Sequence, residues 1–152
     1  MTVGQGSLQA VVMAAGKGSR MTDLTCTKAK CLLPVAGMPM VWWPLNMLQT
    51  NGFTEAIVIV PDSAKNEVLR LPERCGLSLS LRLDVVGVSG QEDIGTADSL
   101  RLVADKLTGA DVLVVSGDLV MEESLRGLVD LHRMKGAALT SLLARWVTIQ
   151  QV

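Results

Sequence analysis

A short apolar run that leads into a glycine-rich basic turn constrains this chain more than any other feature. The run spans Leu8 to Ala15 and is followed by Gly16-Lys17-Gly18-Ser19-Arg20, with Lys28 and Lys30 further on. A buried strand followed by such a turn offers backbone N–H groups and positive charge to a phosphate. Charge alone is equally compatible with a solvated basic loop. The glycines and the preceding strand favour a nucleotide-type pocket, either working or inherited.

Composition excludes several classes of protein. The 152 residues suit one compact domain, and an apolar fraction of 49% is enough to form its core. A net charge of −1 gives no overall attraction to nucleic acid or to an anionic membrane. The apolar stretches are far shorter than the ~18 residues of a membrane span, and the polar start lacks the features of a signal peptide. We therefore expect a cytosolic protein with no direct binding to membranes or nucleic acid.

Strands and helices alternate along the chain. The pattern predicts strands over 8–15, 55–60, 77–88, 111–116 and 137–144. Helices are predicted between them, with Pro39 at the first position of one, Pro72 at the end of the next, and others over 95–107 and 122–135. This alternation predicts an α/β fold, a doubly wound and mainly parallel sheet of order 3-2-1-4-5 with helices on both faces. Because the sequence stops soon after the fifth strand, we expect the sheet to be incomplete at its C-terminal side.

Asp118 follows the fourth predicted strand, just as the basic turn follows the first. In the predicted order these strands are neighbours, and ligands bind where their carboxyl ends diverge. A carboxylate beside a phosphate-binding loop is the minimum arrangement for Mg²⁺ held between an Asp and nucleotide phosphates. A lone Gly-Asp pair is more often a turn or a helix cap, and the converging loop reverses that preference. Met21 stands where a dinucleotide fingerprint needs its third glycine, and no Walker spacing leads into Lys17, which disfavours a dehydrogenase or a P-loop NTPase.

Several motifs occur in a specific order. They read AAGKGSRMTDLT from Ala14, KAKCLLPV from Lys28, GMPM from Gly37, GTADSL from Gly95 and SGDL from Ser116. In this order they resemble the sugar-nucleotide nucleotidyltransferase (pyrophosphorylase) superfamily, whose fold is Rossmann-like. The stretches VVMAAGKGSRMTDLT, WWPLN and DVLVVSGDL resemble most closely the gamma-subunit family of eukaryotic translation initiation factor 2B. The resemblance implies a partial nucleotidyltransferase-like domain over 8–145, between a flexible 1–7 and a divergent tail over 146–152.

The resemblance also implies roles for individual residues. In catalytic relatives the glycine-rich turn and its arginine hold the nucleoside triphosphate, which here would be Gly16, Gly18 and Arg20. A lysine that contacts phosphate would be Lys30, and the Gly-Thr-Ala step on the base and sugar side would be Gly95, Thr96 and Ala97. The aspartate that holds Mg²⁺ would be Asp118.

The sequence also departs from the catalytic pattern. Ala29 and Cys31 replace two prolines around Lys30, and Met38 stands where many relatives carry lysine. We therefore expect a vestigial pocket that needs no cofactor, in a non-catalytic scaffold subunit. By resemblance this subunit would pair with the epsilon and other subunits of initiation factor 2B and promote GDP/GTP exchange on initiation factor 2. The alternative is a Mg-dependent sugar-1-phosphate nucleotidyltransferase.

Overall fold

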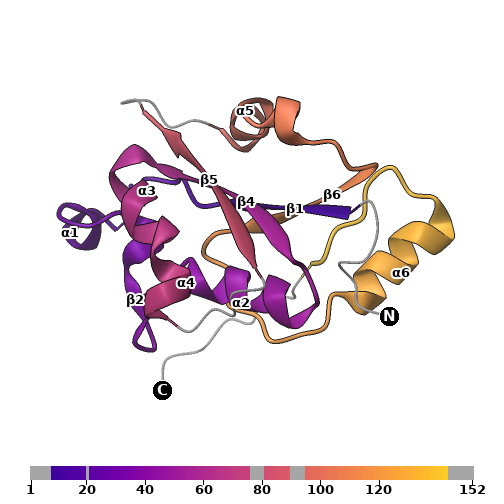
Figure 1. Cartoon of the computed structure of the whole chain (residues 1–152), viewed down its shortest axis with the longest axis horizontal. Helices are drawn as coiled ribbons and strands as arrows, with labels where there is room; N and C mark the ends of the chain where they lie inside the picture. Colours follow the sequence, from indigo (N-terminus) through magenta and orange to yellow (C-terminus); the bar gives the residue numbers. More distant parts are fainter. Residues whose placement is uncertain (1–7, 20, 76–80, 90–94, 144–152) are drawn as a thin grey trace, which may run out of the picture.

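A parallel sheet forms the centre of the molecule. The computed structural model describes residues 8–19, 21–75, 81–89 and 95–143. The sheet has four strands in the order β5–β4–β1–β6, all parallel (Figure 1). They are β1 (Leu8–Met13), β4 (Glu55–Pro61), β5 (Arg82–Val88) and β6 (Asp111–Ser116). In chain order this is third, second, first, fourth, so the predicted doubly wound α/β topology is confirmed. The predicted start of the third strand at residues 77–80 lies outside the described residues.

One face of the sheet is covered by α2 (Trp42–Thr50), α3 (Asp62–Leu69) and α6 (Arg126–Lys135). Alternate strand residues such as Val12, Val58 and Val115 point to this side and are almost fully buried. Leu45 and Leu48 of α2 and Val68 of α3 pack against them, and α4 (Leu71–Arg74) adds Leu71. The apolar faces of the sheet and of the helices therefore pack together in one main core.

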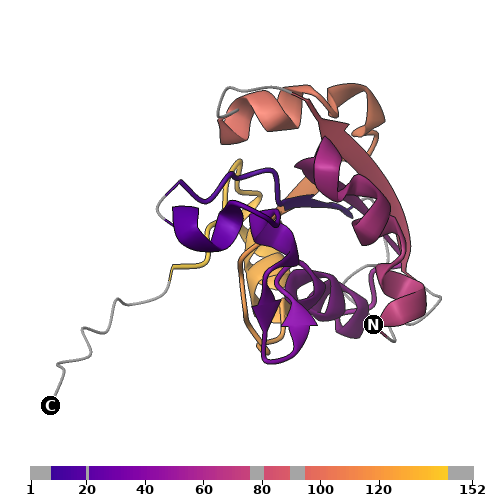
Figure 2. The same ribbon diagram turned by 90° about the vertical axis from the view of Figure 1, so that its left-hand side faces the viewer.

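The opposite face is covered by α5 (Thr96–Arg101) and the short 3₁₀ helix η2 (Ala104–Lys106). Figure 2 shows α5 on the other side of the sheet from α2 and α6. Here the buried residues are Val11, Ile57, Ile59 and Val103. Coverage is partial, because Val112 and Val114 of β6 point to this side and remain 37% and 44% exposed.

A compact connection leads from β1 to α2. It contains α1 (Thr22–Thr25), the 3₁₀ turn η1 (Lys30–Leu32) and a small hairpin of β2 (Pro34–Val35) and β3 (Met38–Pro39). Pro39 therefore lies in a strand, and the prediction that it begins a helix was wrong. The backbone N–H groups of Met40 and Val41 donate to the carbonyls of Leu33 and Cys31, which keeps the chain tied to this connection until Trp42.

Three other predicted boundaries were wrong. The helix predicted over 95–107 ends at Arg101, and the separate 3₁₀ helix η2 follows it. Pro72 lies in the first turn of α4 and does not end α3, a position where proline loses no helical hydrogen bond. The helix predicted over 122–135 begins only at Arg126. The N–H of Leu125 donates to the side chain of Asn51, 2.9 Å away, which fixes the preceding residues in a connection instead of a helical turn.

The predicted fifth strand is absent from the described residues 137–143. The chain leaves α6 through Gly136 in a left-handed conformation, and the N–H of Ala137 donates to the carbonyl of His132. The ring Nδ1 of His132 and the hydroxyl of Thr140 also form a hydrogen bond of 2.9 Å. These contacts tie the segment to α6 instead of to a sheet edge. The helices in the described part of the chain are all too short to cross a membrane.

Candidate functional site

The carboxyl ends of β1 and β6 form the floor of the site. Met13 lies opposite Ser116 in the register of the two strands. The N–H of Gly117 donates to the carbonyl of Met13, 2.8 Å away. A Cβ on Gly117 would lie 2.5 Å from the Cβ of Ala14, so only glycine permits this close approach. The turn that follows β1 and the turn that follows β6 therefore leave the sheet side by side.

Lys30 and Asp118 meet above this floor. The Lys30 ammonium lies 2.5 Å from Oδ2 of Asp118. The hydroxyl of Ser116 donates to the other carboxylate oxygen, Oδ1. The hydrogen bond from Lys30, followed by that from Ser116, holds the pKa of Asp118 below its ordinary value of 3.8 against the opposing effect of burial. Asp118 is therefore a carboxylate at neutral pH, with both oxygens engaged.

Lys30 is positioned without a proline on either side, since its neighbours are Ala29 and Cys31. Ala29 adopts φ −59°, the value that proline would impose. Cys31 is 3% exposed, and burial raises the pKa of its thiol to about 11. Gly18 has φ +70°, and a Cβ there would lie 3.4 Å from the stem of Lys30 and 2.9 Å from Thr25. The segment is held by backbone conformation, a buried thiol and a close glycine contact.

Two neighbouring cavities open at this end of the sheet. The first, of about 120 Å³, is lined by Met13, Ala14, Gly16, Lys30, Cys31, Met40, Ser116, Gly117 and Asp118. The second, of about 290 Å³, is lined by Met13, Ala15, Gly16, Thr96, Ser99, Val114 and Ser116. They share Met13, Gly16 and Ser116, so one holds the charged pair and the other extends toward α5.

The structure brings most of the predicted site residues together. Gly16, Lys30 and Asp118 line the first cavity, and Thr96 lines the second together with Gly16. Gly18 lies close to the stem of Lys30, which a Cβ at this position would meet at 3.4 Å. Gly95 precedes α5, and its carbonyl accepts the Ser99 N–H. Ala97 is exposed and lines neither cavity, and Arg20 lies outside the described residues.

Sequence reasoning missed two serines of the site. Ser116 ends β6 only two residues before Asp118, and this short spacing was a usable signal because it places a hydroxyl beside the carboxylate. Ser99 is 2% exposed, and its hydroxyl donates to the carbonyl of Gly95. Its position one helical turn after Gly95 was the corresponding signal.

The donor set fits a magnesium ion that is held mainly by phosphates. In the described part of the chain no group of three or more His, Cys, Asp or Glu side chains gathers around a common point. The first cavity offers one carboxylate, Asp118. Magnesium in phosphate sites is bound by one or two carboxylates, with substrate phosphates and water completing the shell. Asp118 is thus sufficient as a protein ligand for such an ion and insufficient for an all-protein cage.

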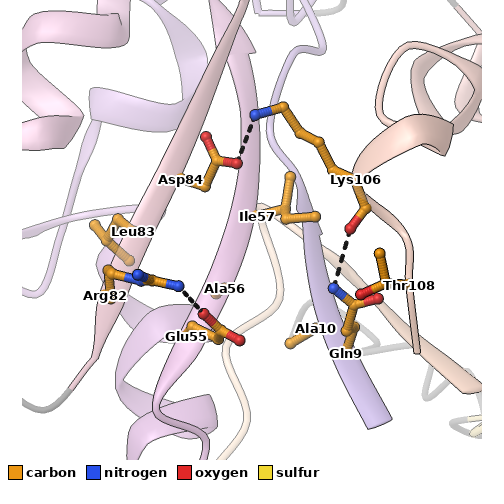
Figure 3. A pocket seen from close by; sticks show the side chains of 10 residues that line it. All are labelled: Gln9, Ala10, Glu55, Ala56, Ile57, Arg82, Leu83, Asp84, Lys106 and Thr108. Carbon is orange, nitrogen blue, oxygen red and sulfur yellow. Dashed lines mark hydrogen bonds and ion pairs between the residues drawn. The ribbon is translucent and has the colours of Figure 1, made fainter. Parts of the chain in front are cut away.

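A larger hollow lies at the amino ends of the strands, away from this site. It has about 520 Å³ and is flanked by two ion pairs, Glu55 with Arg82 and Asp84 with Lys106 (Figure 3). The hydrogen bond from Lys106 to Asp84, 2.7 Å long, raises the pKa of the lysine. Since both cations already have carboxylate partners, this hollow offers a phosphate no unpaired basic group among its lining residues.

The fold and the site together define an α/β protein with a glycine-lined, lysine- and aspartate-bearing pocket at the switch point of its sheet. A family model described as nucleotidyl transferase matches residues 9–149. The chain belongs to the nucleotidyl transferase family.

Relatives within this family are diverse. The chain is 36% identical over 143 residues to translation initiation factor eIF2B subunit gamma of Caenorhabditis elegans, covering 90% of this chain and 34% of that protein. It is 35% identical over 147 residues to the bifunctional protein GlmU of Geobacter metallireducens, covering 92% and 28%. It is 32% identical over 138 residues to mannose-1-phosphate guanylyltransferase of Mycobacterium tuberculosis, covering 91% and 37%. The chain thus spans only about a third of the length of these relatives.

Solved structures show the same fold. A chain assigned as glucose-1-phosphate thymidylyltransferase from Bacillus anthracis matches with a TM-score of 0.68 at 24% identity, covering 84% of this chain and 50% of that one. The inositol-1-phosphate CTP transferase from T. maritima matches with a TM-score of 0.63 at 20% identity, covering 78% and 45%. Both likenesses concern the fold alone.

These comparisons correct the expectation of a non-catalytic subunit. Relatives at 32–35% identity carry the names of a guanylyltransferase and of GlmU, and the structural neighbours are named as transferases. The sequence identity to the gamma subunit, 36%, is almost the same as the identity to GlmU, 35%. The family therefore points to catalytic members, and it does not single out the gamma subunit.

Proposed function

We propose that this chain acts as a sugar-1-phosphate nucleotidyltransferase and binds the nucleoside triphosphate at the carboxyl ends of β1 and β6. The observation that carries the proposal is the Lys30–Asp118 pair beside Gly16 at the carboxyl ends of β1 and β6. An ammonium group, a carboxylate and an open glycine turn in one cavity suit a triphosphate that arrives with a divalent cation. The names of relatives such as mannose-1-phosphate guanylyltransferase support a sugar phosphate as the second substrate.

The reaction joins the two substrates through phosphorus. A phosphate oxygen of the sugar 1-phosphate attacks the α-phosphorus of the nucleoside triphosphate and forms a new P–O bond. The bond between the α-phosphorus and the bridging oxygen breaks, and its electron pair leaves with pyrophosphate. No proton has to move in this step, so the protein's contribution is positioning and charge neutralisation.

The residues of the site divide this work. The Lys30 ammonium neutralises a phosphate oxygen, and Gly16 leaves room for the phosphates because a Cβ there would meet nothing within 4 Å. Asp118 would hold a magnesium ion, which when bound would neutralise phosphate charge and help pyrophosphate leave. Thr96 and Ser99 line the wider cavity on the α5 side, where the nucleoside would lie.

Magnesium-dependent pyrophosphate exchange tests the proposal. The purified full chain is incubated with GTP or UTP, a sugar 1-phosphate and labelled pyrophosphate, and label in the triphosphate is measured. The expected result is exchange that requires magnesium and falls at least ~100-fold in Asp118→Asn, because the charge that organises the phosphates is lost. Exchange that is equal with and without magnesium, or equal in the variant, would contradict the proposal.

A second candidate function is membership of an initiation factor 2B type of assembly. The observation that favours it is the 36% identity to the gamma subunit of the Caenorhabditis elegans factor. Such a role predicts binding to the epsilon subunit and promotion of GDP release from initiation factor 2. Pull-down of purified epsilon subunit by the tagged chain tests it, and the absence of complex at micromolar concentration would rule it out.

A further inference from the structure

The two oxygens of Asp118 are held by donors of different character. Oδ1 receives the hydroxyl of Ser116, which ends β6 and is fixed by the pairing of that strand with β1. Oδ2 accepts a hydrogen bond from the Lys30 ammonium, 2.5 Å away. Lys30 lies in η1, 88 residues before Asp118 in the sequence. A lysine ammonium sits on a flexible four-carbon stem, whereas a serine hydroxyl stays within reach of its own backbone. Lys30 can therefore leave the carboxylate while Ser116 stays.

We propose that Lys30 is a latch on Asp118 that a bound phosphate opens, and that Ser116 is the positioning residue that keeps the carboxylate oriented for a cation once Lys30 has left. The latch rests on the proposed function, because the phosphate that opens it belongs to the nucleotide. Its consequence is that polyphosphate and divalent cation bind this pocket together, and that neither binds well alone.

Electrostatics favours this order of events. In the structure the Lys30 ammonium occupies the oxygen that a cation needs, and a divalent ion arriving alone would meet a positive charge within a hydrogen-bond distance of its ligand. A phosphate entering the same cavity gives Lys30 a second anion to pair with. The side chain of Lys30 is 26% exposed, so it has room to turn toward the cavity that Gly16 lines. As Lys30 turns, Oδ2 becomes free for the cation.

Ser116 has a separate part in this exchange. It lines both the cavity with the charged pair and the wider cavity toward α5, so it lies where the two parts of a nucleotide would join. Its hydroxyl fixes Oδ1 and thereby the rotation of the Asp118 carboxylate. A carboxylate held in this way presents its other oxygen in one direction, which is how supporting hydrogen bonds raise cation affinity.

Thermodynamic linkage between phosphate binding and cation binding makes the latch measurable. If phosphate opens the latch, it raises the affinity for the cation, and the cation must raise the affinity for phosphate by the same factor. Removing the Lys30 charge abolishes the need for opening, so the cation alone should bind better. Removing the Ser116 hydroxyl should weaken only the state in which the cation is present.

Calorimetric titrations of the full chain test the latch at pH 7. The probes are Mn²⁺ alone, as a substitute for magnesium, inorganic triphosphate alone, and inorganic triphosphate with saturating Mn²⁺. The variants are Lys30→Met, Ser116→Ala and Ser116→Thr, with Lys28→Met as the matched control. Lys28 is exposed, carries the same charge and lines neither cavity. Thermal melting confirms that each variant is folded.

The latch predicts a distinct result for each variant. In the wild-type chain and in Lys28→Met, Mn²⁺ should raise triphosphate affinity about tenfold or more. In Lys30→Met, Mn²⁺ alone should bind about tenfold more tightly than in the wild type. In Ser116→Ala, triphosphate alone should bind as in the wild type, whereas triphosphate with Mn²⁺ should bind about tenfold more weakly, and Ser116→Thr should restore the affinity.

The failures are separable. Absence of triphosphate binding to the folded wild type, with and without Mn²⁺, would overturn the proposed function and the latch together. Binding of triphosphate and Mn²⁺ to the wild type with no gain in Mn²⁺ affinity in Lys30→Met would overturn the latch alone. Equal loss in Ser116→Ala and Ser116→Thr, or no loss in either, would overturn the positioning role of Ser116.

Discussion

Lys30 and Asp118 are 88 residues apart in the sequence and lie 2.5 Å apart in the fold. Lys30 comes from the connection after β1 and Asp118 from the turn after β6. The parallel pairing of β1 with β6 brings these two segments to the same edge of the sheet. The ion pair is thus a direct product of the doubly wound topology.

The Lys30–Asp118 pair predicts a pH dependence of stability. Because the pKa of Asp118 is lowered in the folded state from 3.8, the pair stabilises the fold above that pH, and this contribution is lost as the pH falls through the folded-state pKa. With Asp118 44% exposed, the contribution is about 1 kcal/mol or less. Urea unfolding of wild type and Asp118→Asn from pH 2.5 to 7 measures it.

The difference in unfolding free energy between these two proteins should be constant near neutral pH and shrink below pH 3.8. In a Lys30→Met background the same comparison should show a smaller change, since the largest cause of the shift is gone. A difference that grows as the pH falls would refute this account of the pair.

Gly117 should tolerate no side chain. In Gly117→Ala the new Cβ would lie 2.7 Å from the backbone of Ala14, and we expect a loss of about 1–3 kcal/mol in unfolding free energy. Gly127→Ala in α6 is the matched control, because a Cβ there meets nothing within 4 Å. That substitution should raise stability by about 0.5–1 kcal/mol, the usual helix preference for alanine. Equal effects in thermal or urea unfolding would mean that the two turns are not in contact.

The first four strands and their order could be predicted from the sequence, because short apolar runs such as Val11 to Ala14 alternate with helical patterns and parallel crossovers have one hand. The convergence of Gly16 and Asp118 followed from that order. The prediction of a fifth strand rested on an apolar run of leucines. It was wrong, and Leu139 and Leu143 of this run are 82% and 87% exposed. Local pattern does not tell whether a neighbouring strand accepts the backbone.

Finer features of the site could not be predicted from the sequence. The pairing of Lys30 with Asp118 depends on a 3₁₀ turn that no periodicity marks, and on the φ of Ala29, which matches that of the missing proline. With no proline on either side, Lys30 is flanked by a buried Cys31 and lies close to Gly18, where a Cβ would meet its stem at 3.4 Å. Pro39 and Pro72 misled for a similar reason, since proline suits a strand edge and a first helical turn equally well.

The three cysteines are free in the structure, and two of them should differ in reactivity. Cys26 is exposed, whereas Cys31 is buried and its pKa is raised from 9.0 to about 11. A shift of this size lowers the thiolate fraction about 100-fold at neutral pH. Labelling with a maleimide followed by mass spectrometry should modify Cys26 within minutes and Cys31 only after unfolding. Rapid labelling of Cys31 in the native chain would show that η1 opens.

The free edge of β6 should cause self-association. Among the described strands β6 pairs only with β1, and its exposed Val112 and Val114 lie beside the unpaired edge. Unpaired edges with apolar neighbours are templates for pairing with a second copy, and an edge lysine discourages it. Sedimentation velocity should show dimers or larger species at micromolar concentration, reduced in Val112→Lys. Leu69→Lys, at an exposed position of α3, should leave the distribution unchanged, and a monomer in all three proteins would refute the prediction.

Binding of a nucleoside triphosphate in the presence of magnesium tests the central claim most directly. Titration of the full chain with GTP or UTP should give saturable binding with magnesium and at least ~10-fold weaker binding in Asp118→Asn, since one charged ligand of the phosphate-bound cation is removed. Binding that is unaffected by Asp118→Asn, or no binding of either nucleotide to the folded chain, would contradict the claim that β1 and β6 deliver these residues to a working nucleotide site.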